Sequence, residues 1–469
     1  MITRLPKKPA MKFTARPAAK PLAAPIAPKP RPDSRNIQLL KGMKDTLPTE
    51  QHYWNKLRDK AEKLATYYGY QRIDTPILEM TKLFRRTIGE ATDIVEKEMY
   101  TFTDLGGESI TLRPEGTAGV ARAYVEHGMV NQSQPVKFFY IGPMFRHENP
   151  QSGRVRQHHQ FGMEMIGEAS AAVDAEIIFL TYLFYKELGI ATTIHINSIG
   201  TTECRKEYIK QLVAYFRRHR KHLSPDDQRR LGKNPLRLLD SKTDGMAELI
   251  EEAPQIVDWL DDDSKHHFMK VLEYLDAMGV PYVLEPTLVR GLDYYTKTVF
   301  EVLPVVKANA EGEIKRQSAL CGGGRYDGLI ELLGGREQTP ACGVGIGLER
   351  AILEMKRQEK EPPPPTKPKV FLAQVGEQAK QKAFPLFEEF RKEKLAVGQM
   401  FAKDSLKSQL ELADKMGARY VLILGQKEVL EDTVLLRDME GGVQETVSFD
   451  KIVNEVKKRL RDLREVKSH

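Results

Sequence analysis

The distribution of apolar and polar positions divides the chain into a tail, a long body and a short alternating unit. Residues 1–35 are mainly lysine, arginine, proline and alanine, and the first acidic residue is Asp33. So few large apolar side chains cannot support a core, so we predict a disordered basic tail. An organellar transit peptide is the alternative, since such peptides are also basic, but repeated prolines oppose the amphipathic helix that it needs.

The body is predicted to span residues 36–356 and to end at a charged, proline-rich linker over 357–368. After the linker, residues 369–469 show the alternation of a small α/β domain. VFLAQV and ARYVLILG are predicted as strands, and DTVLLRDM and VQETVSF as a hairpin. Helices are predicted around AFPLFEEFRKEK, over SLKSQLELADKMG with an end at Gly417, and over DKIVNEVKKRL.

Within the body, two strands are predicted on either side of one polar loop. VKFFYIGPMF (136–145) and VRQHHQFGMEMIG (155–167) are joined through RHENPQSGR, which fits a long hairpin. Successive side chains of a strand point to opposite faces. The apolar face would carry Val155, Phe161, Met163 and Met165, and the polar face Arg154, Arg156, His158, Gln160 and Glu164.

The polar face of this hairpin is a candidate binding site. A solvated basic hairpin is the simplest alternative for any charged stretch of this kind. A continuous row of arginine, histidine, glutamine and glutamate on one sheet face instead favours a polar ligand that lies across it. Because the arginines stand at one end and Glu164 at the other, the predicted site is cationic at one end and anionic at the other.

Composition narrows the class of protein. The chain has 469 residues, of which 41% are hydrophobic and 29% charged, as in ordinary globular proteins. The net charge of +7 suits a polyanionic partner such as nucleic acid. Cys204, Cys321 and Cys342 lack CxxC spacing, which argues against a disulfide framework or a zinc site and favours a reducing compartment. No apolar run is long enough to span a membrane, so we expect a cytoplasmic protein without membrane partners.

Two further stretches of the body combine charged residues with extended chain. TLRPEGT (111–117) would place Arg113, Glu115 and Thr117 on one face of an extended segment. LVRGLDYYTKTVFE (288–301) would bring an arginine, an aspartate and two tyrosines beside a strand. Each stretch alone is a weak signal for a binding site.

Two glycine-rich stretches follow. CGGGRYDGLIELLGG (321–335) is predicted to form a glycine turn before the start of a helix, where backbone can approach a ligand closely. ACGVGIGLERAIL (341–353) is predicted to run from a strand into a helix that carries Arg350. The glycine spacing does not fit a dinucleotide fingerprint, and the chain has no P-loop sequence.

Together and in this order, these stretches resemble the histidyl-tRNA synthetases, which are class II aminoacyl-tRNA synthetases. The resemblance covers roughly residues 36–465. TPILEMTKLFRRTIGE is similar to the first class motif, FRHENPQSGRVRQHHQF to the second and GVGIGLERAIL to the third. LVRGLDYYTKTVFE and CGGGRYDGL are similar to the two histidine-specific signatures, and TLRPEGT to the amino-acid-binding loop.

The resemblance implies a fold and an activity. The expected fold is an α+β catalytic domain with an antiparallel class II sheet, a helical insertion at about 205–280, and a small C-terminal α/β anticodon-binding domain. The expected reaction activates L-histidine with ATP to histidyl-adenylate and pyrophosphate, and then transfers histidine to the 3′ end of tRNA(His). Mg²⁺ is expected to accompany ATP, and no metal site built from protein side chains is expected. The first motif implies a homodimer.

Two rival functions share much of this fold. One is a non-catalytic regulatory subunit of ATP phosphoribosyltransferase, which generally lacks the intact histidine signature and the anticodon domain. The other is a class II synthetase for proline or threonine. The whole RGLDYYTKTVFE stretch and the further domain after about residue 368 oppose the first rival, and RGLDYYT with Glu164 opposes the second.

The resemblance also assigns catalytic roles to three arginines. Arg146 matches the arginine expected on the α-phosphate and the histidine carboxylate, and Arg350 the one on the γ-phosphate and the adenine face. Arg290 matches the arginine that stands beside the α-phosphate, where related enzymes use a metal ion. These roles fit the chemistry, because activating a carboxylate with ATP brings two anions together, and fixed cations stabilise the developing charge. The ATP-binding set is Arg146, Glu148, Arg154, His158 and Arg350.

Histidine recognition needs groups for both ring nitrogens and for the α-amino group. Glu164 and Tyr295 match the imidazole-binding positions, and a carboxylate and a phenol can orient an imidazole through its two nitrogens. Core packing with a satisfied hydroxyl is the alternative for Tyr326. The whole histidine-binding set is Glu115, Thr117, Arg146, Gln160, Glu164, Arg290, Tyr295 and Tyr326.

For tRNA, the resemblance points to Gln151 in the second-motif loop and to Gln426 and Lys427 in the last domain. The basic helix around CRKEYIKQLVAYFRRHRKHL is either a tRNA contact or a solvated face. Two positions depart from the family: His158 stands where an adenine-stacking phenylalanine is usual, and Asn149 where an arginine is usual.

Overall fold

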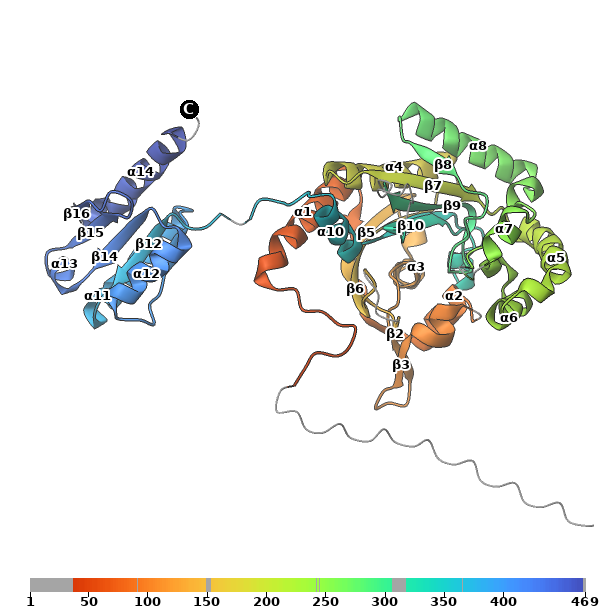
Figure 1. Cartoon of the computed structure of the whole chain (residues 1–469), viewed down its shortest axis with the longest axis horizontal. Coiled ribbons are helices and arrows are strands. Elements are labelled where there is room, and N and C mark those ends of the chain that lie inside the picture. The colour runs from red at the N-terminus through yellow and green to blue at the C-terminus, as the bar shows by residue number, and fades with distance from the viewer. Residues whose placement is uncertain are drawn as a thin grey trace, which may run out of the picture.

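The computed structural model describes residues 37–90, 92–148, 153–241, 243, 245–305, 318–364 and 366–466, so the predicted tail lies outside the described residues. The large body is built on an eight-stranded sheet in the order β1-β5-β6-β11-β10-β9-β7-β8 (Figure 1). Its five inner pairings are antiparallel, which confirms the predicted antiparallel sheet, and only β1 and β8 pair in parallel at the edges. The strands are β1 (Gln71–Arg72), β5 (Val136–Phe145), β6 (Gln157–Ile166), β7 (Thr192–Ser198), β8 (Tyr282–Leu284), β9 (Thr296–Pro304), β10 (Cys321–Arg325) and β11 (Ala341–Gly347).

The predicted long hairpin is confirmed as β5 and β6. Its register runs from Val136 opposite Ile166 to Phe145 opposite Gln157. The predicted apolar face of β6 is also confirmed, because Phe161, Met163 and Met165 are buried in the core on one side of the sheet.

Two helical layers cover the sheet. On the face of Phe161 lie α1 (Gln51–Tyr67), α4 (Ala171–Glu187), α8 (Asp262–Ala277) and α10 (Leu348–Arg357), which share one hydrophobic core with it. On the other face, α3 (Thr117–Glu126) and α5 (Thr202–Arg218) pack in a second core with Phe138 and Tyr140. The second core therefore lies on the same side of the sheet as the predicted polar row, next to the position where a ligand would bind.

The body also contains smaller elements. α2 (Thr81–Ile88) packs beside a three-stranded sheet of β2 (Leu78–Met80), β4 (Ser109–Leu112) and β3 (Tyr100–Thr103). α6 (Pro225–Lys233) and α7 (Met246–Glu251) follow α5 in the predicted insertion. The last helix of that stretch, α8, packs on α4 and so shares the core of the sheet. No helix of the described residues has both the length and the apolar character that crossing a membrane requires.

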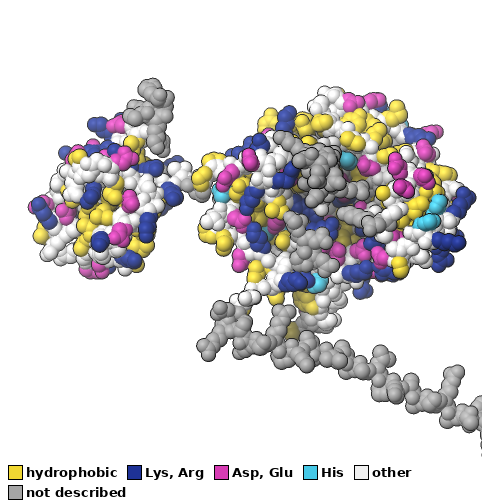
Figure 2. All heavy atoms as spheres, in the orientation of Figure 1, with side chains coloured by type: hydrophobic (Ala, Val, Ile, Leu, Met, Phe, Trp, Pro, Cys, Tyr) yellow, Lys and Arg dark blue, Asp and Glu magenta, His cyan; other side chains and the backbone are white. Residues whose placement is uncertain are grey.

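The small C-terminal domain has the predicted α/β composition. Lysine and arginine side chains are spread over its visible face (Figure 2). Its sheet has the order β13-β12-β14-β15-β16. The predicted strands and hairpin are confirmed as β12 (Val370–Gln374), β14 (Tyr420–Leu424), β15 (Thr433–Asp438) and β16 (Gln444–Ser448). The predicted helices are α11 (Glu377–Lys392), α12 (Leu406–Met416) and α14 (Ile452–Val466), and α12 ends at Gly417 with φ 73°. The sequence did not predict the short β13 (Val397–Gln399) and α13 (Gln426–Leu430).

The predicted glycine turn at 321–324 is wrong, because these residues form the inner strand β10. A Cβ at Gly323 would overlap the carbonyl oxygen of Gly343 on β11, and one at Gly324 would overlap the carbonyl oxygen of Thr298 on β9. The glycines therefore allow close approach of neighbouring strands, as well as of anything that lies on the sheet. The predicted helix start is correct, as α9 (Leu329–Leu332) follows.

Lys297 provides a test of backbone strain. It lies in β9 with φ 48°, beside the register shift between Gly324 and Arg325. A non-glycine residue in this conformation costs about 1–3 kcal/mol, so Lys297→Gly is expected to raise the free energy of unfolding by about 1 kcal/mol. Trp54 and Trp259, the only tryptophans, both belong to the body, so their fluorescence during urea unfolding reports this change.

Lys297→Ala is the matched control, since it removes the lysine side chain but keeps a Cβ. It is expected to show no comparable gain in stability. An equal gain in both variants would mean that the lysine side chain, and not the backbone conformation, is the source of the strain.

Candidate active site

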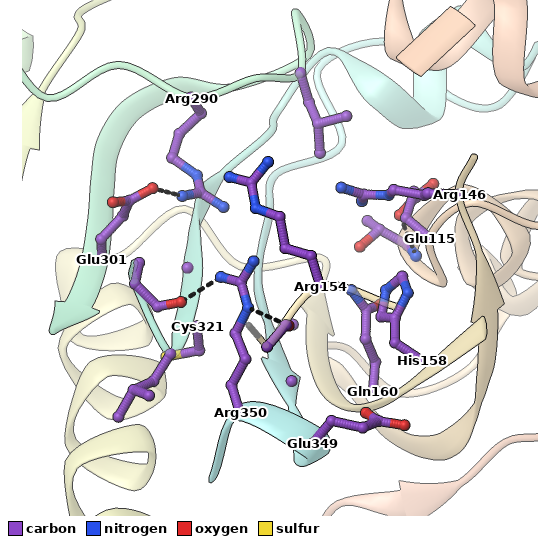
Figure 3. A pocket seen from close by; sticks show the side chains of 18 of the residues that line it. Glu115, Arg146, Arg154, His158, Gln160, Arg290, Glu301, Cys321, Glu349 and Arg350 are labelled. Carbon is purple, nitrogen blue, oxygen red and sulfur yellow. Dashed lines mark hydrogen bonds and ion pairs between the residues drawn. The ribbon is translucent and has the colours of Figure 1, made fainter. Parts of the chain in front are cut away.

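A cavity lies on the sheet over β6, β9, β10 and β11, and most of the predicted site residues line it (Figure 3). The predicted residues on its wall are Glu115, Thr117, Arg146, Glu148, Arg154, His158, Gln160, Arg290, Tyr295 and Arg350. Glu164 and Tyr326 lie behind this wall. Gln426 and Lys427 begin α13 in the small domain, and Gln151 and Asn149 lie outside the described residues.

Arg146 and Arg350 are held by backbone carbonyls. The Nε of Arg146 donates to the oxygen of Pro114 at 2.8 Å. The Nε of Arg350 donates to the oxygen of Gly153 at 3.4 Å, and its Nη1 donates to that of Ala319. Neither guanidinium forms an ion pair with a described carboxylate, in contrast to Arg154 and Arg290, so both can bind an anionic ligand.

Arg154 and Arg290 are instead paired with carboxylates of the cavity. Nη1 of Arg154 lies 3.1 Å from Oε2 of Glu148, and Nη1 of Arg290 donates to Oε1 of Glu301. Burial, and then the neighbouring Arg154, lower the pKa of the Arg350 guanidinium. The wall therefore carries four arginines and also four glutamates, and Arg146 and Arg350 are the two arginines without a described carboxylate partner that could bind a polyanion such as a triphosphate.

His158 lies on the wall near Arg146 and Gln160 (Figure 3). Burial lowers the pKa of His158 to about 3, with a further contribution from the positive charges of Arg146 and Arg350. The imidazole is therefore neutral at physiological pH. A neutral ring can stack on a base without adding charge.

Glu164 is fully buried beneath the cavity and is held by three hydroxyl groups. Thr117 Oγ1 donates to its Oε1 at 2.6 Å, Tyr326 to its Oε2 at 2.5 Å, and Tyr140 to its Oε1 at 3.4 Å. A Cβ at Gly343 of the neighbouring strand would overlap this carboxylate, so glycine leaves it room. Tyr326 thus has a polar partner as well as a packing role.

The pH dependence of stability should reveal Glu164. Burial raises its pKa to about 8, although its hydrogen bonds oppose the shift. An unfolded glutamate loses its proton at about pH 4.3, so between about pH 5 and pH 8 the native state binds more protons, and the free energy of unfolding falls as pH rises. In Glu164→Gln this fall should be smaller.

Urea titrations followed by tryptophan fluorescence at several pH values would measure this slope. Glu187→Gln, which removes an exposed partner of Lys60, is the control and should keep the wild-type slope. Equal slopes in the wild type and Glu164→Gln would contradict the raised pKa.

Glu115 and Arg113 do not share one face. The buried Glu115 carboxylate accepts hydrogen bonds from the amides of Thr117 (2.6 Å) and Ala118 (2.9 Å), where α3 begins. Arg113 points away from the cavity, because its Nη1 donates to the oxygen of Thr75 and its Nε to that of Pro143. The predicted extended segment is therefore wrong after Leu112, where β4 ends.

The alternation predicted for the second hairpin strand also fails before Gln157. Arg154 and the adjacent Val155 both line the cavity, whereas Arg156 packs against Gly42 and donates its amide to the oxygen of that glycine at 2.7 Å. The reason is that β6 begins only at Gln157, and strand parity does not extend into the loop.

Two acidic wall residues had no predicted role. Glu301 is the partner of Arg290, and it ends the LVRGLDYYTKTVFE stretch. Glu349 accepts the amide of His159 at 2.8 Å and lies 2.9 Å from Nδ1 of that histidine. The available signal was that Glu349 directly precedes Arg350 and that Glu301 ends the stretch that begins with Arg290 and its neighbours. Within the part of the chain that the structure describes, no group of three or more histidine, cysteine, aspartate or glutamate residues could hold a metal ion.

Comparisons with known proteins show that this chain is similar to histidyl-tRNA synthetases over most of its length. The sequence model of the family described as Histidyl-tRNA synthetase matches residues 42–351, and that of the Anticodon binding domain matches residues 369–459. The chain is 47% identical to a histidine–tRNA ligase of Dehalococcoides mccartyi over 421 residues, which cover 90% of this chain and 99% of that one. It is 44% identical to a histidine–tRNA ligase of Caldicellulosiruptor saccharolyticus, with 90% and 100% covered.

A solved structure of a protein with the same family name is also similar to this chain over most of its length. The crystal structure of apo S. aureus histidyl-tRNA synthetase is 36% identical in sequence and superposes with a TM-score of 0.72. The match covers 90% of this chain and 99% of that one.

Proposed function

Because the chain belongs to the histidyl-tRNA synthetase family and has the activity of a histidine–tRNA ligase, we propose that the cavity over its eight-stranded sheet activates histidine with ATP. The observation that carries this assignment of the site is the convergence of four arginines and a buried glutamate on one sheet face. The regulatory-subunit alternative is less supported, since relatives named histidine–tRNA ligase match over nearly their whole length and the chain has an anticodon-binding domain.

The arginines bind and orient the anions in this proposal. Arg146 binds the α-phosphate and the histidine carboxylate, Arg290 binds the α-phosphate, and Arg350 binds the γ-phosphate. Attack of the histidine carboxylate on the α-phosphorus forms the adenylate and releases pyrophosphate. The charge that develops on the α-phosphate oxygens is stabilised by guanidinium groups already in place. Arg154 and Glu148 complete the ATP site, and the neutral ring of His158 lies against adenine.

The histidine pocket is the end of the cavity near Glu164. Tyr295 and Glu164 would orient the imidazole, with Tyr326 supporting Glu164 through its hydroxyl. Three hydroxyls donate to Glu164, so a ring nitrogen that bound this carboxylate would replace one of them. Glu115, Thr117 and Gln160 would hold the α-amino and carboxylate groups. A site built from such hydrogen bonds rejects amino acids that cannot make them.

Mg²⁺ is proposed to enter with ATP. Magnesium prefers oxygen ligands and keeps several waters, so phosphate oxygens can supply much of its coordination. We assign no protein side chain to it.

The small domain is proposed to contact the anticodon, with Gln426 and Lys427 at the start of α13 as candidates. The Lys427 side chain is 75% exposed, which leaves it accessible to RNA. Gln151 is proposed to contact the acceptor end of the tRNA.

The domain limits proposed for the chain are 36–356 for the catalytic domain, with the linker at 357–368 and the anticodon-binding domain from 369.

The first-motif region is proposed as a homodimer interface. Ile77 and Leu78 before α2, and Phe102 and Leu105 of the β3–β4 hairpin, are exposed apolar side chains. Ile77 and Leu78 adjoin a groove lined by the apolar Pro76, Met80 and Leu83 and by charged residues of α2 and α3, and burial of the apolar side chains would favour association.

A cytoplasmic location is also proposed, and the buried, unpaired state of Cys204, Cys321 and Cys342 suits a reducing compartment.

Histidine-dependent ATP–pyrophosphate exchange tests the proposed function of the cavity. The wild-type chain should exchange label with histidine and not with proline or threonine, which test the other class II activities. Absence of exchange with histidine would contradict the proposal, and exchange with proline or threonine alone would reassign the amino acid.

A further inference from the structure

Glu301 lies on the wall of the cavity. It ends the LVRGLDYYTKTVFE stretch, in which only Arg290 and Tyr295 were predicted as site residues. It belongs to β9 and stands directly opposite Gly322 of β10 in the sheet. Its Oε1 accepts a hydrogen bond from Nη1 of Arg290 (Figure 3). The two side chains are only 27% and 17% exposed, so water competes less with this pair than with a surface ion pair.

Gly322 and Tyr295 close the other sides of the Arg290 guanidinium. A Cβ at Gly322 would overlap Cζ and both Nη atoms of Arg290. Glycine at this position therefore leaves the space that the guanidinium occupies. Cζ of Arg290 lies 5.7 Å from the centre of the Tyr295 ring, within the range of a cation–π contact. The buried Nε finds no hydrogen-bond partner among the described residues, so Glu301, Gly322 and Tyr295 determine the orientation.

The pairing of Arg290 is not explained by affinity for ATP. A carboxylate beside an anion-binding arginine lowers the local positive charge and so weakens attraction to a triphosphate. Arg146 and Arg350 are held by carbonyl oxygens, which orient them without an added negative charge. The benefit of Glu301 must therefore come from geometry, since a fixed donor needs no reorganisation when charge develops on the α-phosphate.

We propose that Glu301 is a positioning residue for adenylate formation, which fixes the Arg290 guanidinium in the space left by Gly322. This inference rests on the proposed function of the cavity. Glu301 does not touch the reacting atoms and acts only through Arg290. Its removal should therefore lower the rate of the chemical step and leave ATP binding unchanged or slightly tighter.

The test measures kcat and KM for ATP in histidine-dependent pyrophosphate exchange. Glu301→Gln keeps the shape of the side chain and removes its charge, and kcat is expected to fall about 100-fold, as for a misplaced catalytic group. KM for ATP is expected to stay equal or to fall. Gly322→Ala displaces the same guanidinium from the opposite side and should lower kcat in the same way, by steric contact and without a change of charge.

Glu354→Gln is the matched control, because Glu354 forms an ion pair with Arg357 on α10 and does not line the cavity. It should keep the wild-type kcat. Thermal unfolding of each variant checks that the body is folded. A wild-type kcat in Glu301→Gln, or a loss that appears only as a raised KM for ATP, would overturn the inference. Failure of the proposed function is distinguished from this, because it would appear as absent exchange in the wild type, and that result would overturn both.

Discussion

Replacing Arg290 by lysine is expected to lower histidine-dependent pyrophosphate exchange by about 10²–10³-fold, which is the usual loss for a missing transition-state donor. The Arg290 guanidinium meets Glu301 on one side and the cavity on the other. Its planar fork can hold the carboxylate and still present donors to two oxyanions, whereas a lysine ammonium is a point charge on a flexible stem. Lysine would keep the positive charge but would lack the planar set of donors that can bind Glu301 and two oxyanions together.

Arg357→Lys makes the same substitution in a pair outside the cavity, where Arg357 contacts Glu354. That variant should retain wild-type exchange, and both variants should unfold at nearly the same temperature as the wild type. Wild-type exchange in Arg290→Lys would remove Arg290 from the catalytic groups.

Asp174→Asn is expected to lower the free energy of unfolding of the body by about 3–5 kcal/mol. Asp174 of α4 and Arg325 at the end of β10 are both completely buried, and Nε of Arg325 donates to Oδ2 of Asp174 at 3.1 Å. His267 of α8 lies 3.3 Å from the same oxygen. Although burial alone would raise the pKa of Asp174, the Arg325 guanidinium lowers it, so the aspartate is charged. The asparagine variant leaves the Arg325 guanidinium without its main counter-charge.

The double variant Asp174→Leu with Arg325→Met should be more stable than Asp174→Asn, because it removes both buried charges together. Glu187→Gln, which breaks an exposed pair with Lys60, should cost about 1 kcal/mol or less. Urea unfolding followed by fluorescence of Trp54 and Trp259 measures all three. A loss in Asp174→Asn no larger than that in Glu187→Gln would show that Arg325 finds sufficient compensation elsewhere.

Regular alternation made much of the fold predictable from the sequence. β6 has apolar positions at strand spacing, so its two faces could be assigned before the structure. β12 and β14 of the small domain were predictable from continuous apolar runs, which are typical of buried strands. The prediction failed over 154–156, where the chain is a loop and Arg156 turns to Gly42. It also failed at β10, because three consecutive glycines are typical of a turn and carry no side chains to show that neighbouring strands enclose them.

The candidate site was predictable to the extent that its residues stand in recognisable motifs. Residues from five separate stretches meet on one wall, which the order of those stretches along the chain does not show. Glu301 and Glu349 were missed because their roles depend on a partner, Arg290 for one and His159 for the other, that only the folded sheet brings within reach. Arg113 was placed wrongly because its neighbours in sequence are site residues and its neighbours in space are not.

The three buried cysteines supply an internal set of kinetic probes. Cys321 and Cys342 belong to inner strands of the large sheet, whereas Cys204 lies in α5 beside Asp261, which precedes α8. A thiol reagent reaches each of them only when its surroundings open. Their labelling rates, compared in the same sample, would tell whether α5 separates from the sheet on its own or only when the whole body unfolds.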